Sequence, residues 1–491
     1  MSGINFIKNT FANFTIKIVI ILSWFIITIF SARFLPITDF GKFIIYNTTL
    51  NLLTTFSTTF VSNTILRLYP EFKKKLNLDD FLSNMFYYIL FSTSIIIFLI
   101  LFFKFQFPIF INKILPFSIG YLIAPLIIIN IYNYFLSIYR AKGKILLYSF
   151  FNFWQLIGSF CVGFFFYKFL NREPSDFYLG YICSLFLFSP IIYIKFKDII
   201  YKLFDNKPTS KYASELFNYG FPILIIGTSS LLLSNLDRYF IIYLLDLSKS
   251  TLYSASYTIS EQSILVITGL ISITSVPYLF NIYETKGIES AKIFQEKILK
   301  FYLFLTLPIV IVLFFFYKEI LFYLLSSKYQ NGFFILPYIS AGAFFIGLSN
   351  VFSDVFTLKK KTKKLMYVYF ASLSLNITLN YVLVIKYDIL GAAIATLCSY
   401  ILLFILTFTL SRELIKLNIL KKDLYKLIIS IILLSTLCYI IKNSIIINTL
   451  YGLLVYIIIS FLFYFTIIFS LKYFDLKIFF EGIYKINKKL F

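Results

Sequence analysis

Long apolar stretches alternate with short polar connectors along the whole of this 491-residue chain. About fourteen of the stretches approach the roughly 20 helical residues needed to cross a bilayer core. They are apolar on almost every side, as in Ile95–Phe103 and Leu303–Phe316, and do not alternate as barrel strands do. A helix satisfies its backbone hydrogen bonds internally, even in lipid. We therefore predict an all-α polytopic membrane protein.

The basic residues fall mainly in every second connector. The predicted spans are 13–34, 43–66, 82–104, 114–138, 146–168, 177–195, 218–240, 252–278, 300–323, 332–355, 366–386, 389–411, 425–441 and 445–471. Of the 45 Lys and Arg residues, 33 lie on one side of these spans and 12 on the other. Because cytoplasmic loops carry the excess of basic residues, both termini are predicted to be cytoplasmic. The net charge of +23 follows from this bias, so we expect no nucleic-acid partner.

The connectors on the predicted outer side are too short to form a catalytic domain. The chain has no histidine, and its sequence shows no nucleophile or metal-ligand cluster. We therefore expect no catalytic residue, no metal and no cofactor, and we place the function within the membrane. A membrane-bound glycan polymerase or ligase is the alternative from a different class.

Several features recur in the same order in spans one to six and seven to twelve. Ser31–Leu35, near the end of the first span, corresponds to Leu236–Tyr239, near the end of the seventh. Because six is an even number, the two halves have the same orientation. We predict two parallel six-helix lobes, 1–210 and 211–415, around a central cavity, with a C-terminal helix pair in 416–491.

Polar residues recur at helical spacing in two corresponding spans. In span 43–66 these residues are Asn47, Asn51, Thr54, Thr58 and Ser62. In span 252–278, Tyr253, Tyr257 and Glu261 are successive i, i+4 neighbours. Hydroxyls often join helices in membranes, which is the alternative for any single Ser or Thr. The two stripes together predict a water-filled cavity between the halves.

Charged residues inside the predicted spans are candidate functional groups because their insertion is costly. Glu261 lies deep in its span, Asp354 lies near the inner end of span 332–355, and Asp237 lies towards an outer end. These three carboxylates are our ion-coupling candidates. Arg33 and Arg238 also lie towards outer ends, where an arginine side chain can instead extend to the interface.

Short motifs along nearly the whole chain resemble those of one transporter family. They are Ala32–Leu35 with Phe40-Gly41, Gly220–Pro222, Leu236–Arg238, Tyr253–Tyr257, Leu336-Pro337, Lys360–Thr362, Asn376, Asn380-Tyr381 and Gly391–Thr396. With these residues the chain resembles the polysaccharide transporter or O-antigen flippase family of the multidrug/oligosaccharidyl-lipid/polysaccharide exporter superfamily.

The resemblance implies two lobes that open alternately to either side of a bacterial inner membrane. Its implied substrate is a polyprenyl-diphosphate-linked oligosaccharide, moved from the cytoplasmic to the outer leaflet. Membrane lipid and glycan-assembly proteins are the implied partners. The anionic diphosphate suits Arg33 and Arg238. Sugar hydroxyls suit the polar stripes, from which we select the candidates Asn47, Asn51, Thr58, Tyr253 and Tyr257. A cation-coupled multidrug antiporter using Glu261 and a lipid II flippase are the alternatives within the superfamily.

Overall fold

The computed structural model describes residues 23–473, except for residues 76, 171 and 360. It also leaves out several residues, but not all, within 188–219, 416–420 and 445–448. Every regular element in this part of the chain is a helix. Eight described helices are long and apolar enough to cross a membrane. The chain is therefore an all-α, multi-pass membrane protein, as predicted. Both termini and the part of span 13–34 before Ser23 lie outside the described residues.

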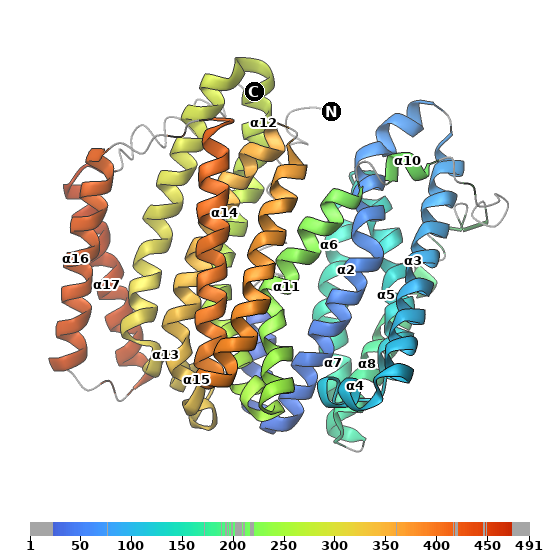
Figure 1. Ribbon diagram of the computed structural model, residues 1–491, viewed down its shortest axis with the longest axis horizontal. Helices are drawn as coiled ribbons and strands as arrows, with labels where there is room; N and C mark the ends of the chain where they lie inside the picture. The colour runs from blue at the N-terminus through green and yellow to red at the C-terminus, as the bar shows by residue number, and fades with distance from the viewer. Residues whose placement is uncertain are drawn as a thin grey trace. The chain divides into compact units, whose positions relative to one another are not determined.

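The first of two compact units comprises Val19–Ser254 and Thr362–Ala392. Its complete elements are Ser23–Phe34, α2 (Ile37–Lys74), α3 (Leu78–Gln106), α4 (Pro108–Ile114), α5 (Gly120–Ala141), α6 (Ile145–Phe153), the π-helix η1 (Trp154–Gly158), α7 (Ser159–Phe169), α8 (Pro174–Phe186), α10 (Ala213–Glu215) and α11 (Phe221–Leu244). Helix α2 packs against α3, α5 and α11 (Figure 1).

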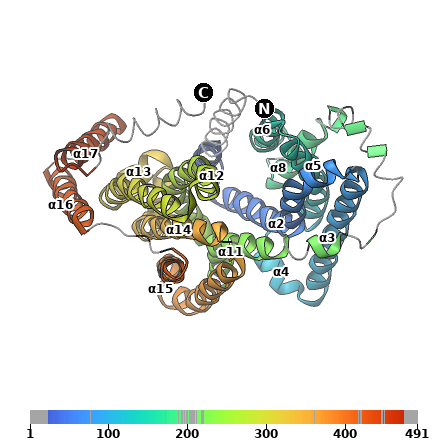
Figure 2. The same ribbon diagram turned by 90° about the horizontal axis from the view of Figure 1, so that it is seen from above.

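The second unit contains Ala255–Lys361 and Ala393–Phe491. Its elements are most of α12 (Leu247–Phe315), α13 (Tyr317–Leu324), the 3₁₀ helix η3 (Ser327–Ile335), α14 (Leu336–Leu358), the second part of α15 (Thr362–Arg412), α16 (Lys421–Ser444) and α17 (Leu450–Ser470). Helices α16 and α17 lie side by side in both views (Figures 1 and 2). The lobe boundaries predicted at 210 and 415 stay a prediction.

Two helices each join a pair of predicted spans. Helix α12 covers span 252–278 and span 300–323 as far as Phe315, and its backbone leaves the helical region at Gly287, where φ is 79°. Glycine adopts this conformation without the steric cost that a side chain adds. Helix α15 covers spans 366–386 and 389–411 and breaks at Asp388, where φ is 56°. The Asp388 carboxylate accepts a 2.7 Å hydrogen bond from the Ile389 amide, which supports this conformation.

Close backbone contact joins α7 to α8. A Cβ atom placed on Gly180 would lie 2.5 Å from the Gly163 Cα atom. The absence of both side chains therefore lets the two helices approach more closely than larger residues permit. This contact fixes α8 beside α7, and both helices contribute residues to the cavity described next.

Candidate functional site

A cavity of about 320 Å³ lies within the first unit. Its walls come from Ser23–Phe34, α2, α5, α6, η1, α7 and α8. This volume is at the lower end of the range for small-molecule sites. We call it the amide-and-aromatic cavity after the residues that line it.

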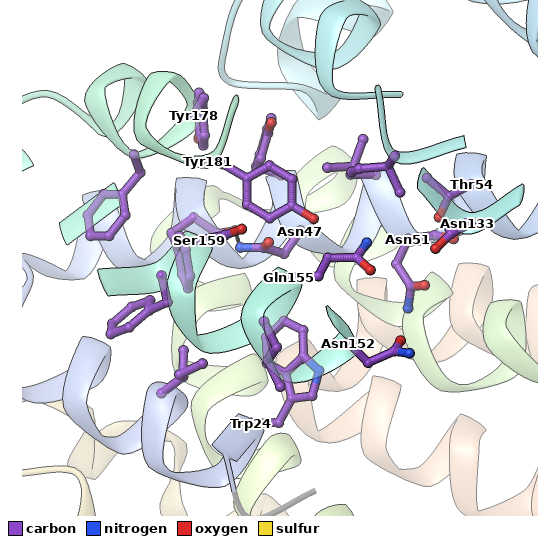
Figure 3. Close-up of a pocket in the computed structure, with 18 residues that line it drawn as sticks. Trp24, Asn47, Asn51, Thr54, Asn133, Asn152, Gln155, Ser159, Tyr178 and Tyr181 are labelled. Carbon is purple, nitrogen blue, oxygen red and sulfur yellow. Dashed lines mark hydrogen bonds between the residues drawn. The ribbon is translucent and has the colours of Figure 1, made fainter. Parts of the chain in front are cut away.

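Five carboxamide side chains line this cavity from four elements. They are Asn47 and Asn51 on α2, Asn133 on α5, Asn152 on α6 and Gln155 on η1. Figure 3 shows these amide groups around the cavity, with Trp24 at one side and Tyr181 at another. Each amide offers both a hydrogen-bond donor and an acceptor.

Some of these amide groups already make hydrogen bonds that orient them. The Asn47 Nδ2 atom donates to the Phe43 carbonyl at 2.9 Å, and the Asn152 Nδ2 atom donates to the Tyr148 carbonyl at 2.8 Å. Each bond leaves the amide with further hydrogen-bonding capacity. The side chain of Gln155 hydrogen-bonds to Tyr181.

Aromatic rings form much of the remaining wall. The lining rings are Trp24, Phe43, Tyr46, Phe160, Phe177, Tyr178 and Tyr181. The rings of Tyr46 and Tyr178 stack with centroids 3.7 Å apart. Their hydroxyls donate to the carbonyls of Tyr121 (3.1 Å) and Lys42 (3.3 Å), so both rings are fixed in place.

A π-helical turn presents Gln155 to the cavity. π-Helical turns inside α-helices are rare and frequently occur at functional sites. Within this turn, a Cβ atom on Gly158 would lie 2.5 Å from the Trp154 ring, so glycine makes room for the indole. The indole Nε1 donates to the Ser184 carbonyl on α8 at 3.0 Å. These contacts hold the turn against α8.

The lining residues combine hydrogen-bonding amides with aromatic faces, and within the described part of the chain none of them is charged. Amides can pair with hydroxyl groups as donor and acceptor. Aromatic rings offer apolar surface with a fixed orientation. This chemistry suits a neutral polyhydroxylated group better than an ion.

The structure places the predicted polar stripe of α2 in two environments. Asn47, Asn51 and Thr54 line the cavity. Thr58 is buried outside the lining, and its hydroxyl donates to the Thr54 carbonyl of its own helix at 2.7 Å. Arg33 is exposed on Ser23–Phe34 and is also outside the lining.

Sequence reasoning missed the residues of α5, α6 and η1 that line the cavity. Asn133 is a single lining amide on α5, whereas Asn152, Gln155 and Ser159 recur at i, i+3 and i+7 within span 146–168 and all line the cavity. The available signals were this spacing and the cost of any polar side chain at membrane depth.

A second polar cluster in the first unit joins α11, the start of α12 and α15. The Tyr253 hydroxyl donates to Asp237 Oδ2 at 2.5 Å, and Asn380 Nδ2 donates to Asp237 Oδ1 at 2.8 Å. Arg238 Nε donates to the Ser254 hydroxyl at 3.1 Å. The predicted residues Asp237 and Tyr253 are thus buried in one hydrogen-bonded group, and the predicted Arg238 is buried with Ser254 as a partner.

The remaining candidates belong to the second unit. The Tyr257 hydroxyl donates to Glu261 Oε1 at 2.9 Å and lies 3.1 Å from the Tyr400 hydroxyl. Glu261 is only 7% exposed. Asp354 on α14 is half-buried, and the side chain of Gln295 on α12 is its hydrogen-bond partner. In the described residues no group of three or more Cys, Asp or Glu side chains is arranged to hold a metal ion.

Comparison with known sequences gives two partial matches, and no family model matches the chain. An uncharacterized membrane protein of Methanocaldococcus jannaschii is 25% identical over 235 residues, which are 47% of this chain and 46% of that protein. A second from the same organism is 28% identical over 211 residues, 42% of this chain and 49% of that protein. The chain spans about half the length of the curated relatives it matches.

Comparison with solved structures covers nearly all of the chain. The lipid II flippase MurJ in an inward closed conformation gives a TM-score of 0.71 at 18% identity, over 94% of this chain and 98% of MurJ. An inward-facing multidrug resistance MATE family transporter of the MOP superfamily gives a TM-score of 0.65 at 14% identity, over 82% of this chain and 97% of that transporter. The chain therefore has the fold of these transporters. Its place in the polysaccharide flippase family stays a prediction.

Proposed function

We propose that this protein is a flippase that moves a lipid-linked oligosaccharide across the cell membrane. The observation that carries the proposal is the amide-and-aromatic cavity. Five carboxamides and seven aromatic rings line it among membrane-crossing helices. A neutral saccharide can exchange hydrogen bonds with the amides while its apolar faces contact the rings.

The similarity of fold supports transport as the activity. MurJ is named as a lipid II flippase, and it matches 94% of this chain. We extend this activity to a polyprenyl-diphosphate-linked glycan on the strength of the motifs and of the cavity. Alternating access, with the two lobes opening in turn to either side, is the mechanism that we propose.

The diphosphate needs cationic partners, and we propose Arg33 and Arg238 for this role. Guanidinium groups bind phosphate oxygens through paired donors. Arg238 is 6% exposed and contacts Asn235 and Ser254, so its head group is already oriented. Arg33 is exposed and has room to meet a bulky lipid head group.

Deletion of the gene in the source cells tests the proposal. We expect loss of a surface glycan and accumulation of its lipid-linked precursor, both restored by the wild-type gene. Arg33→Ala and Arg238→Ala are expected to restore membrane protein levels without full glycan assembly. Normal surface glycans in the deletion strain would contradict the proposed function, and normal glycans in both variants would contradict the arginine roles alone.

Cation-coupled antiport is the second candidate, favoured by the buried Glu261. Its carboxylate accepts a hydrogen bond from Tyr257 and is almost fully removed from solvent. A carboxylate in such a position can exchange a proton or a cation during transport. Under this candidate, Glu261→Gln abolishes the dependence of transport on an ion gradient. An unchanged dependence would exclude Glu261 from coupling.

A further inference from the structure

A second cavity, of about 820 Å³, lies within the second unit. Its lining residues are Tyr317, Lys318, Glu319, Phe322, Tyr323, Gln330, Phe333, Phe334 and Ile447. They belong to α13, to η3 and to the connector between α16 and α17. These segments connect membrane-crossing helices, so we place the cavity at the membrane boundary, on the outer side in the predicted topology. We call it the headgroup cavity.

Glu319 gives this cavity an unsatisfied acceptor. Its Oε2 atom is buried and has no hydrogen-bond partner among the described residues. A buried acceptor without a partner destabilises the protein. A donor arriving from the cavity, which Glu319 lines, would remove this destabilisation.

Aromatic rings line the same cavity as Glu319. Five of the nine lining residues are Tyr or Phe, and the rings of Phe322 and Tyr323 meet edge to face at 5.4 Å. An alkylammonium group is attracted both to aromatic faces and to a carboxylate. Part of this cavity therefore has the features that recognise an amine.

Two lysines lie close to Tyr317, which lines the cavity. Lys318 is exposed in the cavity wall, with its Nζ atom 5.9 Å from the centroid of the Tyr317 ring. Lys442 approaches that ring to 5.4 Å and donates to the Phe315 carbonyl at 2.8 Å. Because Lys318 is exposed, it can turn towards an anionic group. The charge arrangement thus matches a molecule with adjacent ammonium and phosphate groups.

Ordinary interfacial anchoring explains only some of these residues. Aromatic belts and lysines that extend to the interface are common at the ends of membrane helices. Such anchoring does not require a carboxylate oxygen buried without a partner beside a large cavity. Glu319 is therefore the feature that points to a ligand.

We propose that the headgroup cavity binds an aminophospholipid headgroup. The ammonium contacts Glu319 and the aromatic rings, the phosphate contacts Lys318, and the glycerol and chains extend into the bilayer. The volume accommodates a headgroup with its glycerol, whereas an isolated amine would leave most of it empty. This site is independent of the proposed glycan transport.

Thermal unfolding of the full-length protein in lipid nanodiscs tests this inference. The probes are nanodiscs of phosphatidylglycerol alone and of phosphatidylglycerol mixed with phosphatidylethanolamine, with identical acyl chains. We expect ethanolamine lipid to raise the unfolding temperature of wild type above that in the glycerol lipid. In Glu319→Gln the apparent affinity for the ethanolamine lipid falls at least about tenfold. Equal stabilisation of wild type in both kinds of nanodisc would overturn the proposal.

Matched variants separate the headgroup contact from general effects. Glu284→Gln removes an exposed carboxylate outside the cavity and is expected to keep the lipid preference. Phe334→Leu removes a ring that is 40% exposed and is expected to weaken the preference without unfolding. If Glu319→Gln and Phe334→Leu both keep the wild-type preference, the site is wrong. Soluble phosphoethanolamine, added to the protein in detergent, distinguishes a free headgroup from a lipid. If it raises the unfolding temperature as much as the ethanolamine lipid does, the ligand is the free compound and the proposed lipid is wrong.

Discussion

Single amides determine what the amide-and-aromatic cavity can bind. Gln155 and Asn133 line it from different helices, and both carry neutral groups that can donate and accept hydrogen bonds. Gln155→Met and Asn133→Leu preserve approximate volume but remove the polar atoms. We expect each change to weaken binding of a lipid-linked oligosaccharide by several-fold to about tenfold, the value of one lost hydrogen bond. Titration of the purified protein with the glycolipid measures this effect.

Asn63 provides the matched control for these substitutions. It also lies on α2, and its Nδ2 atom donates to the Thr59 carbonyl at 2.9 Å, but it does not line the cavity. Asn63→Leu is expected to leave glycolipid affinity unchanged. Equal losses in Asn63→Leu and Gln155→Met would show that the substitutions act through general destabilisation.

Lys142, just after α5, gives a prediction on pH. Burial, followed by repulsion from Lys144 and Lys73, lowers the pKa of its ammonium group, while Asp79 partly offsets this. A lysine with a lowered pKa in the folded state destabilises the fold while it is charged. Lys142→Gln is therefore expected to raise the unfolding temperature at neutral pH. This gain should shrink as the pH rises through the lowered pKa towards the ordinary value of 10.5.

Thermal unfolding of both proteins across this pH range checks the sign. A variant less stable than wild type at neutral pH, or a gain that grows with pH, would contradict the assignment. Added salt should also reduce the gain, because part of the repulsion is between exposed groups.

At the scale of elements, the contact between α7 and α8 depends on glycine. A Cβ atom on Gly180 would lie 2.5 Å from the Gly163 Cα atom. A Cβ atom on Gly227 would lie 3.9 Å from its nearest neighbour, the Thr59 methyl group, which is an ordinary van der Waals distance. Gly180→Ala therefore forces α7 and α8 apart, at a cost of about 1–3 kcal/mol. We expect a lower unfolding temperature in detergent for Gly180→Ala and no loss for Gly227→Ala. Similar stability of both variants would contradict the packing described for α7 and α8.

The sequence predicted the helices better than it predicted their breaks and their polar contacts. Apolar length and charge alternation indicated a helical membrane protein because lipid leaves the backbone few other choices. The π-helical turn at Trp154–Gly158 could not be predicted, because the helical spacing of Asn152, Gln155 and Ser159 does not reveal it. The predicted stripe on α2 includes Asn47 and Asn51, which line the cavity within the first unit, and their role in substrate binding stays a prediction. Thr58 has the same spacing but bonds within its own helix, a choice that periodicity cannot reveal.

At the scale of the whole molecule, the shared fold does not determine the substrate. MurJ and the MATE transporter share this fold at 18% and 14% identity, although their names give them different substrates. The substrate must therefore be argued from side chains. A neutral cavity lined by amides and aromatic rings favours a glycan, and the buried Glu261 adds a candidate for energetic coupling.

Transbilayer movement of a lipid-linked glycan tests the central claim most directly. The purified protein is reconstituted into vesicles with a fluorescent polyprenyl-diphosphate oligosaccharide, and a membrane-impermeant quencher reports the fraction exposed outside. We predict that wild type makes nearly all of the fluorophore accessible. The double variant Asn133→Leu/Gln155→Met should do so more slowly at equal protein content, and Asn63→Leu should match wild type. Accessibility no greater than in protein-free vesicles would contradict the proposed function.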